Sequence, residues 1–337
     1  MKTIKLAVTM GDPGGIGPET ALKAVYHSRW PAAIRFILVG SYAVWLKYAI
    51  RLNLPRLYEA RNIEETADKK ISIWDPLDAG GEKYSITKWR PGRTGRPEGL
   101  TSLLWIRAAA AGCLAGAFGG MVTSPICKSS IQSAGCKFPG HTEYLAYLAG
   151  CKKVAMMLIG GPLRVVLATR HLPLANVAES LTRRKIIEAV EMASLGIKWL
   201  NLPQKTIGVC ALNPHAGDGG LLGYEEKKII TPALEQLRRA GIKVQGPIPA
   251  DVIFHQALQD KFGAVAAMYH DQGLGPLKMI AFEQGVNLTL GLPFVRTSPD
   301  HGTAFDIAGK GIASSSSTVA AIKLALQLAE CPNPWKR

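Results

Sequence analysis

The sequence has no apolar run long enough to cross a membrane as a helix. Such a span takes about 20 consecutive apolar residues, and every apolar run in these 337 residues is shorter. The run Ile4–Met10 near the start predicts a first β-strand rather than a signal peptide. We therefore expect no membrane partner.

The sequence also has no Cys-x-x-Cys pair. Its six cysteines are scattered, at Cys113, Cys127, Cys136, Cys151, Cys210 and Cys331. Scattered thiols in a chain of this length are typical of a reducing compartment, and they argue against a zinc–thiolate site. We expect a cytoplasmic protein with unpaired cysteines.

Acidic residues are few. The chain has 25 Asp and Glu against 40 Lys and Arg, which gives a net charge of +15. The basic residues are dispersed, with only short clusters such as Arg183–Lys185, and no basic tail or RNA-binding signature is present. This pattern favours a small anionic substrate over a nucleic acid.

Apolar residues are abundant, at 47% of the chain, and they predict a sizeable core. The length suits one large α/β unit or two lobes. Short apolar runs, typical of strands covered on both faces, lie at Ile4–Met10, Ile34–Gly40, Gly120–Thr123, Val154–Ile159, Arg164–Ala168, Thr206–Leu212 and Ala264–Tyr269. Their alternation with helical stretches predicts a layered α/β fold with a largely parallel sheet.

Four stretches have helical composition: Leu100–Ala117, a helix from Thr182 to about Leu200, Glu225–Ala240 and Ser317–Ala329. Thr182 is the expected N-cap of the second, because a threonine hydroxyl can accept a hydrogen bond from the first turn. The stretch Trp89–Gly99 is rich in proline, glycine and arginine, and predicts an exposed loop or a β-excursion.

A glycine-rich motif, GDPGGIGPE at residues 11–19, follows the first strand and opens a helix. Its glycines permit a tight turn and the close approach of a ligand, and Pro18 suits a first helical position. It is not the G-x-G-x-x-G fingerprint, because Thr20 stands where the third glycine would be. The motif therefore predicts either a ligand loop or a structural turn, and not a classical Rossmann site.

Three of the seven histidines follow predicted strands. These are His171, His215 and His270. The ends of parallel strands meet at one edge of a sheet, where α/β proteins bind ligands. Neutral imidazoles bind zinc or a similar ion and leave positions open for substrate oxygens. The repeated pattern predicts a joint metal site.

Further polar residues stand in two other contexts. His141 and Thr142 lie at a predicted helix start, where backbone N–H groups can hold an anion; the alternative is a capping box with Thr142 as N-cap. Lys278, Asn287 and Arg296 interrupt a mostly apolar region. The glycine-punctuated segment 301–311 predicts a nucleotide loop or a turn.

Together these motifs resemble the 4-hydroxythreonine-4-phosphate dehydrogenase family of pyridoxal phosphate synthesis. The similarity runs from Gly11 to about Ala313, and its most specific segments are LNPHAGDGG, YHDQG and GLPFVRTSPDHGTAFDIAGKG.

The family is distantly similar to isopropylmalate and isocitrate dehydrogenases. The resemblance therefore implies a layered, isopropylmalate-dehydrogenase-like α/β fold with two lobes and a cleft between them. It implies one discontinuous lobe of residues 1–125 and 297–337 that holds the nucleotide loop. The other lobe, residues 126–296, would hold the metal and substrate residues and the dimer interface.

The resemblance also implies site residues. Metal ligands are implied at His171, His215 and His270. Substrate contacts are implied at His141, Thr142, Lys278, Asn287 and Arg296. Cofactor contacts are implied at Gly11, Asp12, Gly15, His301, Gly302 and Asp306. Lys278, or a water held by Asp271, is the candidate to take the substrate's hydroxyl proton.

The implied reaction is the oxidation of 4-phosphohydroxy-L-threonine with NAD or NADP and a divalent metal such as zinc, magnesium or cobalt. A β-keto acid would form and lose CO2 to give 3-amino-2-oxopropyl phosphate. The resemblance also implies a homodimer whose metal site is shared, with the YHDQG histidine coming from the partner subunit. Two alternatives stay open. One is a dehydrogenase of D-threonate or D-erythronate 4-phosphate; the other is phosphate acyl transfer, which would not need three metal histidines.

Overall fold

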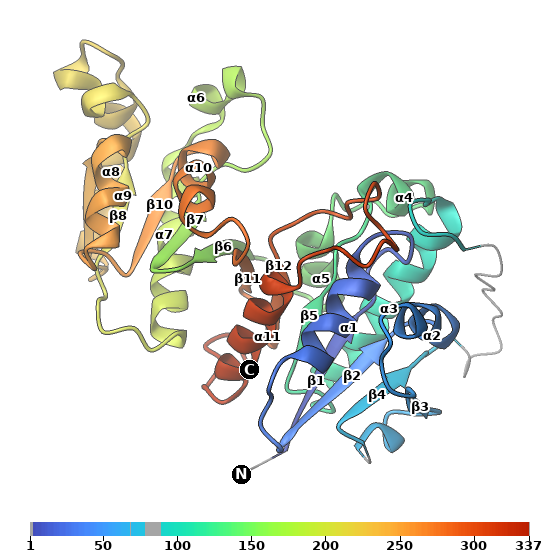
Figure 1. The fold of residues 1–337 in the computed structure, drawn as a ribbon. Helices are drawn as coiled ribbons and strands as arrows, with labels where there is room; N and C mark the ends of the chain where they lie inside the picture. The colour runs from blue at the N-terminus through green and yellow to red at the C-terminus, as the bar shows by residue number, and fades with distance from the viewer. Residues whose placement is uncertain (1–2, 68, 78–88, 337) are drawn as a thin grey trace. The chain divides into compact units, whose positions relative to one another are not determined.

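The computed structural model describes residues 3–67, 69–77 and 89–336, and the chain divides into two compact units (Figure 1). The first unit consists of Met1–Lys153 and Leu292–Arg337, and the second is Val154–Gly291. These division points differ from the expected ones after residues 125 and 296, because helices α4 (Lys128–Ser133) and α5 (His141–Leu148) pack against a helix of the first unit. The lobe boundaries themselves stay a prediction.

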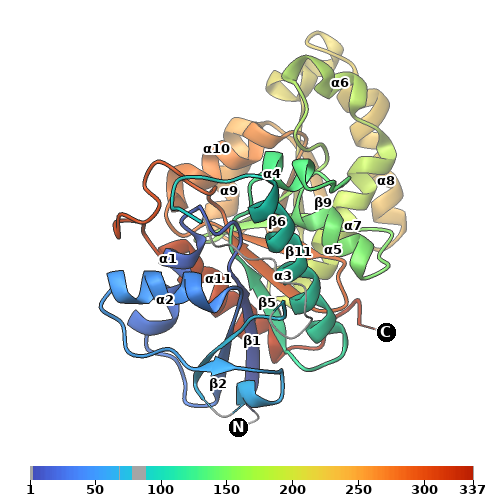
Figure 2. The ribbon, with the colours of Figure 1, turned by 90° about the vertical axis from the view of Figure 1, so that its right-hand side faces the viewer.

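Within the first unit each strand is parallel to the next, in the order β3-β4-β2-β1-β5-β12. Their bounds are β1 Ile4–Thr9, β2 Ile34–Val39, β3 Glu59–Ala60, β4 Ile71–Trp74, β5 Gly120–Thr123 and β12 Val295–Pro299. Helices lie on both sides of these strands (Figure 2), which explains why β1, β2 and β5 are nearly continuous apolar runs.

The helices of this unit form two groups. On one side α3 (Arg96–Leu114) packs against α4 and α5. On the other, α1 (Gly17–His27) packs against α2 (Tyr42–Arg51) and α11 (Ser316–Ala329). Pro18 lies in the first turn of α1, as predicted. The short 3-10 helix η1 spans Glu65–Ala67.

The second unit has the strand order β11-β6-β7-β10-β8-β9. The bounds are β6 Ala155–Gly160, β7 Leu163–Leu167, β8 Ile207–Cys210, β9 Val244–Ile248, β10 Ala264–Ala267 and β11 Val286–Leu290. β6 is antiparallel to both β11 and β7, whereas β7, β10, β8 and β9 run parallel. The carboxyl ends of these four strands therefore lie at one edge.

The helices of the second unit are α6 Val177–Ser180, α7 Arg183–Trp199, α8 Thr231–Arg239, α9 Ala250–Leu258 and α10 His270–Ala281. Three short segments complete it: η3 Leu174–Asn176, η4 Pro214–Gly220 and the π-helix η5 Glu226–Ile230. α10 lies close against β7 and β10. A Cβ at Gly273 would come within 2.6 Å of Val165 Cγ1, so this position needs glycine.

The predicted layered α/β architecture is confirmed, and the seven predicted strands form with ends shifted by no more than a few residues. Thr182 is the N-cap of α7, and its hydroxyl accepts the Lys185 N–H at 3.3 Å. The predicted helix at Glu225–Ala240 instead begins as the π-helix η5. Five strands were not predicted, namely β3, β4, β9, β11 and β12. In β12 the buried polar residues Arg296, Thr297 and Ser298 interrupt the apolar pattern. Among the described residues, no helix combines the length and apolar character needed to cross a membrane.

Candidate active site

Each of the three strand-end histidines follows a strand of the second unit, and those strands are neighbours. His171 follows β7, His270 follows β10 and His215 follows β8, in the spatial order β7-β10-β8. Both pairings are parallel, with Val265 opposite Val165 and Gly208. The histidines therefore leave the sheet at the same edge, which is where the sequence predicts a ligand site.

Two buried polar side chains tie the ends of these strands together. The Thr169 hydroxyl donates to the Met268 carbonyl at 2.7 Å, which joins the end of β7 to the end of β10. The Gln272 amide accepts the Met268 N–H at 2.7 Å and donates to the Ala211 carbonyl at 2.7 Å, which joins β10 to β8. Sequence reasoning assigned no role to either residue, although Gln272 stands inside the YHDQG motif.

The structure brings His171 and His270 together. Their ring centroids are 5.5 Å apart, with the ring planes at 40°. His270 Nδ1 lies 2.6 Å from the exposed carboxylate of Asp271. With the proton on Nδ1, this contact orients the ring and leaves the Nε2 lone pair for a metal. Asp271 therefore contacts His270, the expected metal ligand, directly.

His215 lies in a left-handed turn. Five consecutive residues, 215 to 219, have positive φ angles between 41° and 79°. Three of them, His215, Ala216 and Asp218, are not glycine, and each costs roughly 1–2 kcal/mol in this conformation. Among the described residues, no three His, Cys, Asp or Glu side chains are grouped closely enough to bind one ion. His215 is thus not placed in one group with His171 and His270.

A buried cationic site lies in the first unit. The Arg296 side chain on β12 is 2% exposed, and its Nε and Nη2 donate to the Thr123 hydroxyl at 3.1 and 2.6 Å. Burial lowers the pKa of Arg296 to about 10, although nearby Glu143 opposes the shift. Since that value is well above neutrality, the guanidinium stays charged at pH 7.

His141 and Thr142 lie in the first turn of α5, close to this arginine. Burial and the charge of Arg296 hold the pKa of His141 well below its usual range. Although the residue as a whole is partly exposed, its Nε2 is buried without a hydrogen-bond partner. Thr142 is buried, and the N-cap of α5 is Gly140, so the alternative of a capping box with Thr142 as N-cap is wrong. A charged arginine beside a neutral histidine can bind an anion.

The two other expected substrate residues lie in the second unit. Lys278 is on α10, two helical turns after His270, and its Nζ is 5.7 Å from the Phe282 ring centroid. Asn287 is on β11; its Nδ2 lies 3.3 Å from Met156 Sδ, and its buried Oδ1 has no hydrogen-bond partner.

The two expected cofactor segments pack against each other in the first unit. The Ile16 N–H donates to the Thr303 carbonyl at 2.9 Å, and a Cβ at Gly15 would lie 2.9 Å from that same oxygen. Gly11 has a φ of +72°, and a Cβ there would lie 2.3 Å from the Pro125 carbonyl oxygen. These glycines are therefore required by close backbone contacts.

Asp12 is fully buried within this loop. Its carboxylate accepts the Gly14 N–H at 2.9 Å and a short hydrogen bond from Thr94, whose hydroxyl also contacts Ser130 Oγ at 2.7 Å. Burial raises the pKa of Asp12 to about 6, against the opposing effect of the two hydrogen bonds. The sequence predicts an exposed loop or a β-excursion around Thr94. Residues 89–95 do form a loop in which Arg90, Gly92 and Arg93 are exposed, but Trp89 is buried and its indole donates to the Pro13 carbonyl at 2.6 Å. The end of the predicted loop is wrong, because α3 begins at Arg96.

The 301–311 segment forms turns at the rim of this loop. His301 Nδ1 lies 3.0 Å from the Gly302 carbonyl oxygen, and Asp306 is exposed on the turn that follows. The Glu19 carboxylate accepts the N–H groups of Gly311 and Ala313 at 3.1 and 2.9 Å, which attaches the segment to α1. The 301–311 segment is therefore attached to α1 through Glu19, while Asp306 is exposed to solvent.

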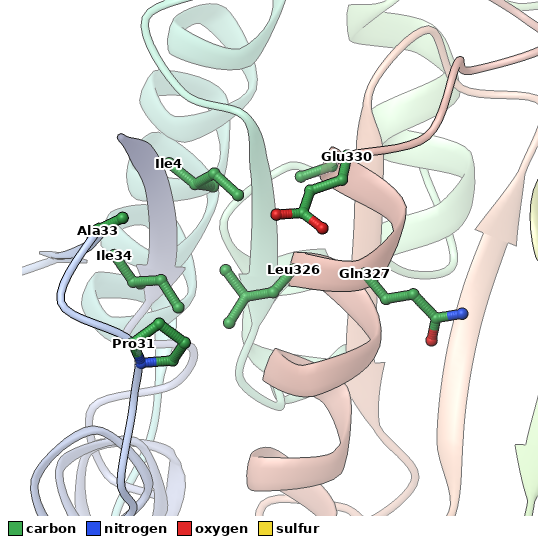
Figure 3. A pocket seen from close by; sticks show the side chains of 8 residues that line it. Ile4, Pro31, Ala33, Ile34, Leu326, Gln327 and Glu330 are labelled. Atoms are coloured by element: carbon green, nitrogen blue, oxygen red, sulfur yellow. The ribbon is translucent and has the colours of Figure 1, made fainter. Parts of the chain in front are cut away.

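A cavity of about 560 Å³ lies elsewhere in the first unit (Figure 3). It is lined by Ile4, Pro31, Ala33, Ile34, Leu326, Gln327, Ala329 and Glu330. Ile4 and Ile34 are the first residues of β1 and β2, so the cavity lies at the amino ends of these strands. None of the predicted site residues lines this cavity.

Comparison with known proteins identifies the family. The model of the family described as pyridoxal phosphate biosynthetic protein PdxA matches residues 32–325. A 4-hydroxythreonine-4-phosphate dehydrogenase of Beijerinckia indica is 44% identical, over 98% of this chain and 96% of that protein. A D-threonate 4-phosphate dehydrogenase of Pectobacterium atrosepticum is 39% identical, over 96% of this chain and 99% of that protein.

A solved structure has the same fold along the whole chain. The crystal structure of 4-hydroxythreonine-4-phosphate dehydrogenase from Klebsiella pneumoniae has a TM-score of 0.84 and 37% identity, over 98% of this chain and all of that one. The resemblance seen in the motifs is thereby confirmed at the level of family and fold. The chain belongs to the PdxA family of pyridoxal phosphate biosynthetic proteins.

Proposed function

We propose that this protein oxidises 4-phosphohydroxy-L-threonine with NAD, in pyridoxal 5′-phosphate biosynthesis. The product, 2-amino-3-oxo-4-phosphooxybutanoate, is a β-keto acid that loses CO2 to give 3-amino-2-oxopropyl phosphate. The observation that carries the proposal is the row of three histidines after adjacent parallel strands, whose ends are joined by Thr169 and Gln272. Relatives that span the whole chain are named for this activity.

The donor chemistry of the three histidines fits a divalent metal. His171 and His270, whose ring centroids lie 5.5 Å apart, would offer two imidazole nitrogens, and His215, which is not grouped with them among the described residues, would offer a third. Nitrogen donors suit zinc or cobalt better than magnesium, which prefers oxygen ligands. When bound, the metal would act as a Lewis acid toward the C3 hydroxyl of the substrate.

The chain's own residues would bind the substrate's anionic groups and move its proton. Arg296 stays charged and can bind phosphate or carboxylate with two parallel hydrogen bonds, with His141 and Thr142 nearby. In the second unit, Lys278 and Asn287 are the proposed contacts, and the open Asn287 Oδ1 can accept a hydrogen bond from a substrate N–H or O–H. Lys278, or a water held by Asp271, would take the proton of the C3 hydroxyl.

The cofactor would bind at the paired loops of the first unit and accept the hydride from C3. Gly11, Asp12 and Gly15 would form one side of the cofactor site, while His301, Gly302 and Asp306 would contact the cofactor from the facing segment. We propose NAD over NADP, because Asp306 would repel a 2′-phosphate. We also propose a cytoplasmic homodimer with a shared metal site.

A second candidate substrate is D-threonate 4-phosphate, because a relative with that name matches almost the whole chain. Purified protein should be assayed with NAD, added zinc or cobalt, and either phosphorylated acid, following the absorbance of the reduced cofactor. We expect a higher kcat/KM for phosphohydroxythreonine. A higher value for D-threonate 4-phosphate would reassign the substrate, and no reduction of either NAD or NADP with any of these compounds would refute a dehydrogenase.

A further inference from the structure

The turn that carries His215 rests on a buried carboxylate, Glu226. We propose that Glu226 is a positioning residue that holds this left-handed turn in the conformation needed for metal binding by His215. The inference rests on the proposed function, since the metal is part of it. Glu226 is the first residue of the π-helix η5, and its side chain is buried.

The carboxylate binds the two residues that lead from β8 into the turn. Its Oε1 accepts the backbone N–H of Leu212 at 2.9 Å and that of Asn213 at 2.8 Å. Its Oε2 accepts the Asn213 side-chain amide at 2.9 Å. An ionised carboxylate accepts such bonds more strongly than a neutral group does. The direction in which the chain leaves β8 is therefore set by Glu226.

The same carboxylate lies under the middle of the turn. Gly217 is buried with a φ of +79°, and a Cβ at this position would lie 2.7 Å from Glu226 Oε2. Hydrogen bonds from Leu222 N–H to the Gly217 carbonyl, at 3.1 Å, and from Leu221 N–H to the Asp218 carbonyl, at 3.2 Å, close the turn. Glycine at position 217 is thus required by both the backbone and the carboxylate.

Two general arguments connect this arrangement with function. Non-glycine residues with positive φ persist only where their surroundings hold them, and they cluster at active sites. One-turn π segments inside helices are also frequent at functional sites. Here the π-helix precedes α8 directly and places Glu226 beneath the strained turn of a proposed metal ligand. Groups that support metal ligands in this way typically change metal affinity 10–100-fold when replaced.

The experiment compares Glu226→Gln with the matched control Glu225→Gln. Glu225 is adjacent, less buried, and accepts from the same Asn213 amide at 2.7 Å, so both changes remove one charge beside that side chain. Both carboxylate oxygens of Glu226 accept hydrogen bonds from N–H groups. In Glu226→Gln one of these oxygens is replaced by an NH2 group, which donates, so at least one of these N–H groups would face another donor. Metal-free protein would be titrated with zinc or cobalt calorimetrically. Hydrogen exchange of amides 212–222 would be measured on the same samples, and urea unfolding would establish that each variant is folded.

We expect the Kd of Glu226→Gln for the metal to rise about 10–100-fold, with faster exchange at amides 212–222. The metal Kd of Glu225→Gln should stay within about twofold of the wild-type value.

If Glu226→Gln does not fold, Gly217→Ala serves as the second variant, because its methyl group would displace the same carboxylate. Unchanged metal affinity and unchanged exchange in a folded variant would overturn the inference, as would an equal loss in Glu225→Gln. A wild-type protein that binds no divalent metal would instead refute the metal in the proposed function. The exchange data would still decide whether Glu226 holds the turn.

Discussion

His171 and His270 of one chain face each other with their ring centroids 5.5 Å apart. The two residues follow adjacent parallel strands that Thr169 joins at their ends. The family resemblance implies that the YHDQG histidine comes from the partner subunit, whereas this geometry favours His171 and His270 as ligands from one chain. If these two histidines bind the metal within one chain and the metal site is shared, His215 would come from the partner.

Mixing inactive variants tests this assignment. His215→Ala mixed with His270→Ala should recover activity, because one site of each hybrid dimer keeps all three ligands. His171→Ala mixed with His270→Ala should recover none, because each hybrid site lacks one ligand. With random subunit exchange, about a quarter of all sites would be intact in the first mixture.

Other outcomes of this experiment have distinct meanings. Recovery in both mixtures would show that His270 does come from the partner. No recovery in either mixture, despite proven subunit exchange, would mean that each chain builds its own site. Retention of stoichiometric metal in both the His215→Ala and His270→Ala proteins would refute the metal assignment itself.

Arg296→Ala should weaken substrate binding strongly and NAD binding little. Removing an arginine contact to a substrate anion in a closed site typically costs about 2–5 kcal/mol, roughly 30-fold or more in affinity. Arg164→Ala is the control, because Arg164 is an arginine near the start of β7, in the second unit, and is not an expected substrate contact. Substrate KM and kcat, with calorimetric binding of NAD, check the prediction. Unchanged KM and kcat in Arg296→Ala would show that this arginine does not contact the substrate.

Asp12 should make stability depend on pH near neutrality. Burial raises its folded-state pKa from 3.8 to about 6. The protonated form is therefore favoured by folding, and this contribution is fully present below pH 3.8 and lost as the pH rises through about 6. Relative to isosteric Asp12→Asn, the wild type should gain about 1.4 kcal/mol of unfolding free energy between pH 7.5 and pH 5. Urea unfolding of both proteins at the two pH values measures it, and parallel pH profiles would contradict it.

Gln272→Met should destabilise the fold by about 2–5 kcal/mol, because the buried Met268 N–H and Ala211 carbonyl would each lose a partner. Gln259→Met, at the residue that follows α9, is the control, since Gln259 is exposed. Urea unfolding compares the two variants. Equal stability would mean that other groups satisfy these backbone atoms.

Asp306 should select NAD over NADP. The residue is exposed on the 305–309 turn, where a carboxylate can accept hydrogen bonds from a ribose 2′-hydroxyl and repel a 2′-phosphate. Asp306→Ala should narrow the ratio of the two specificity constants by roughly tenfold. Lys310→Ala should widen the ratio, because a nearby lysine can compensate a phosphate. A wild type that favours NADP, or an unchanged ratio in Asp306→Ala, would exclude Asp306 as the selecting residue.

The sequence by itself determined seven of the twelve described strands and the set of strand-end histidines. β1, β2, β5 and β10 are mostly apolar because helices or neighbouring strands leave them little solvent-facing surface, so short apolar runs are enough to find them. Parallel topology then places His171, His215 and His270 at a common edge. The same reasoning could not find β12, because its polar side chains are buried only through tertiary contacts such as that of Arg296 with Thr123.

Only the tertiary structure decided how these residues are held. Gln272 contacts a carbonyl 61 residues away, and Thr169 contacts one 99 residues away, so no local pattern could reveal either role. Likewise the left-handed turn at His215 contradicts the local preference of three of its five residues. It is stable because Glu226, from a later segment, lies beneath it. Local propensity is set by neighbouring residues, whereas strained conformations and buried carboxylates depend on contacts that exist only after the chain has folded.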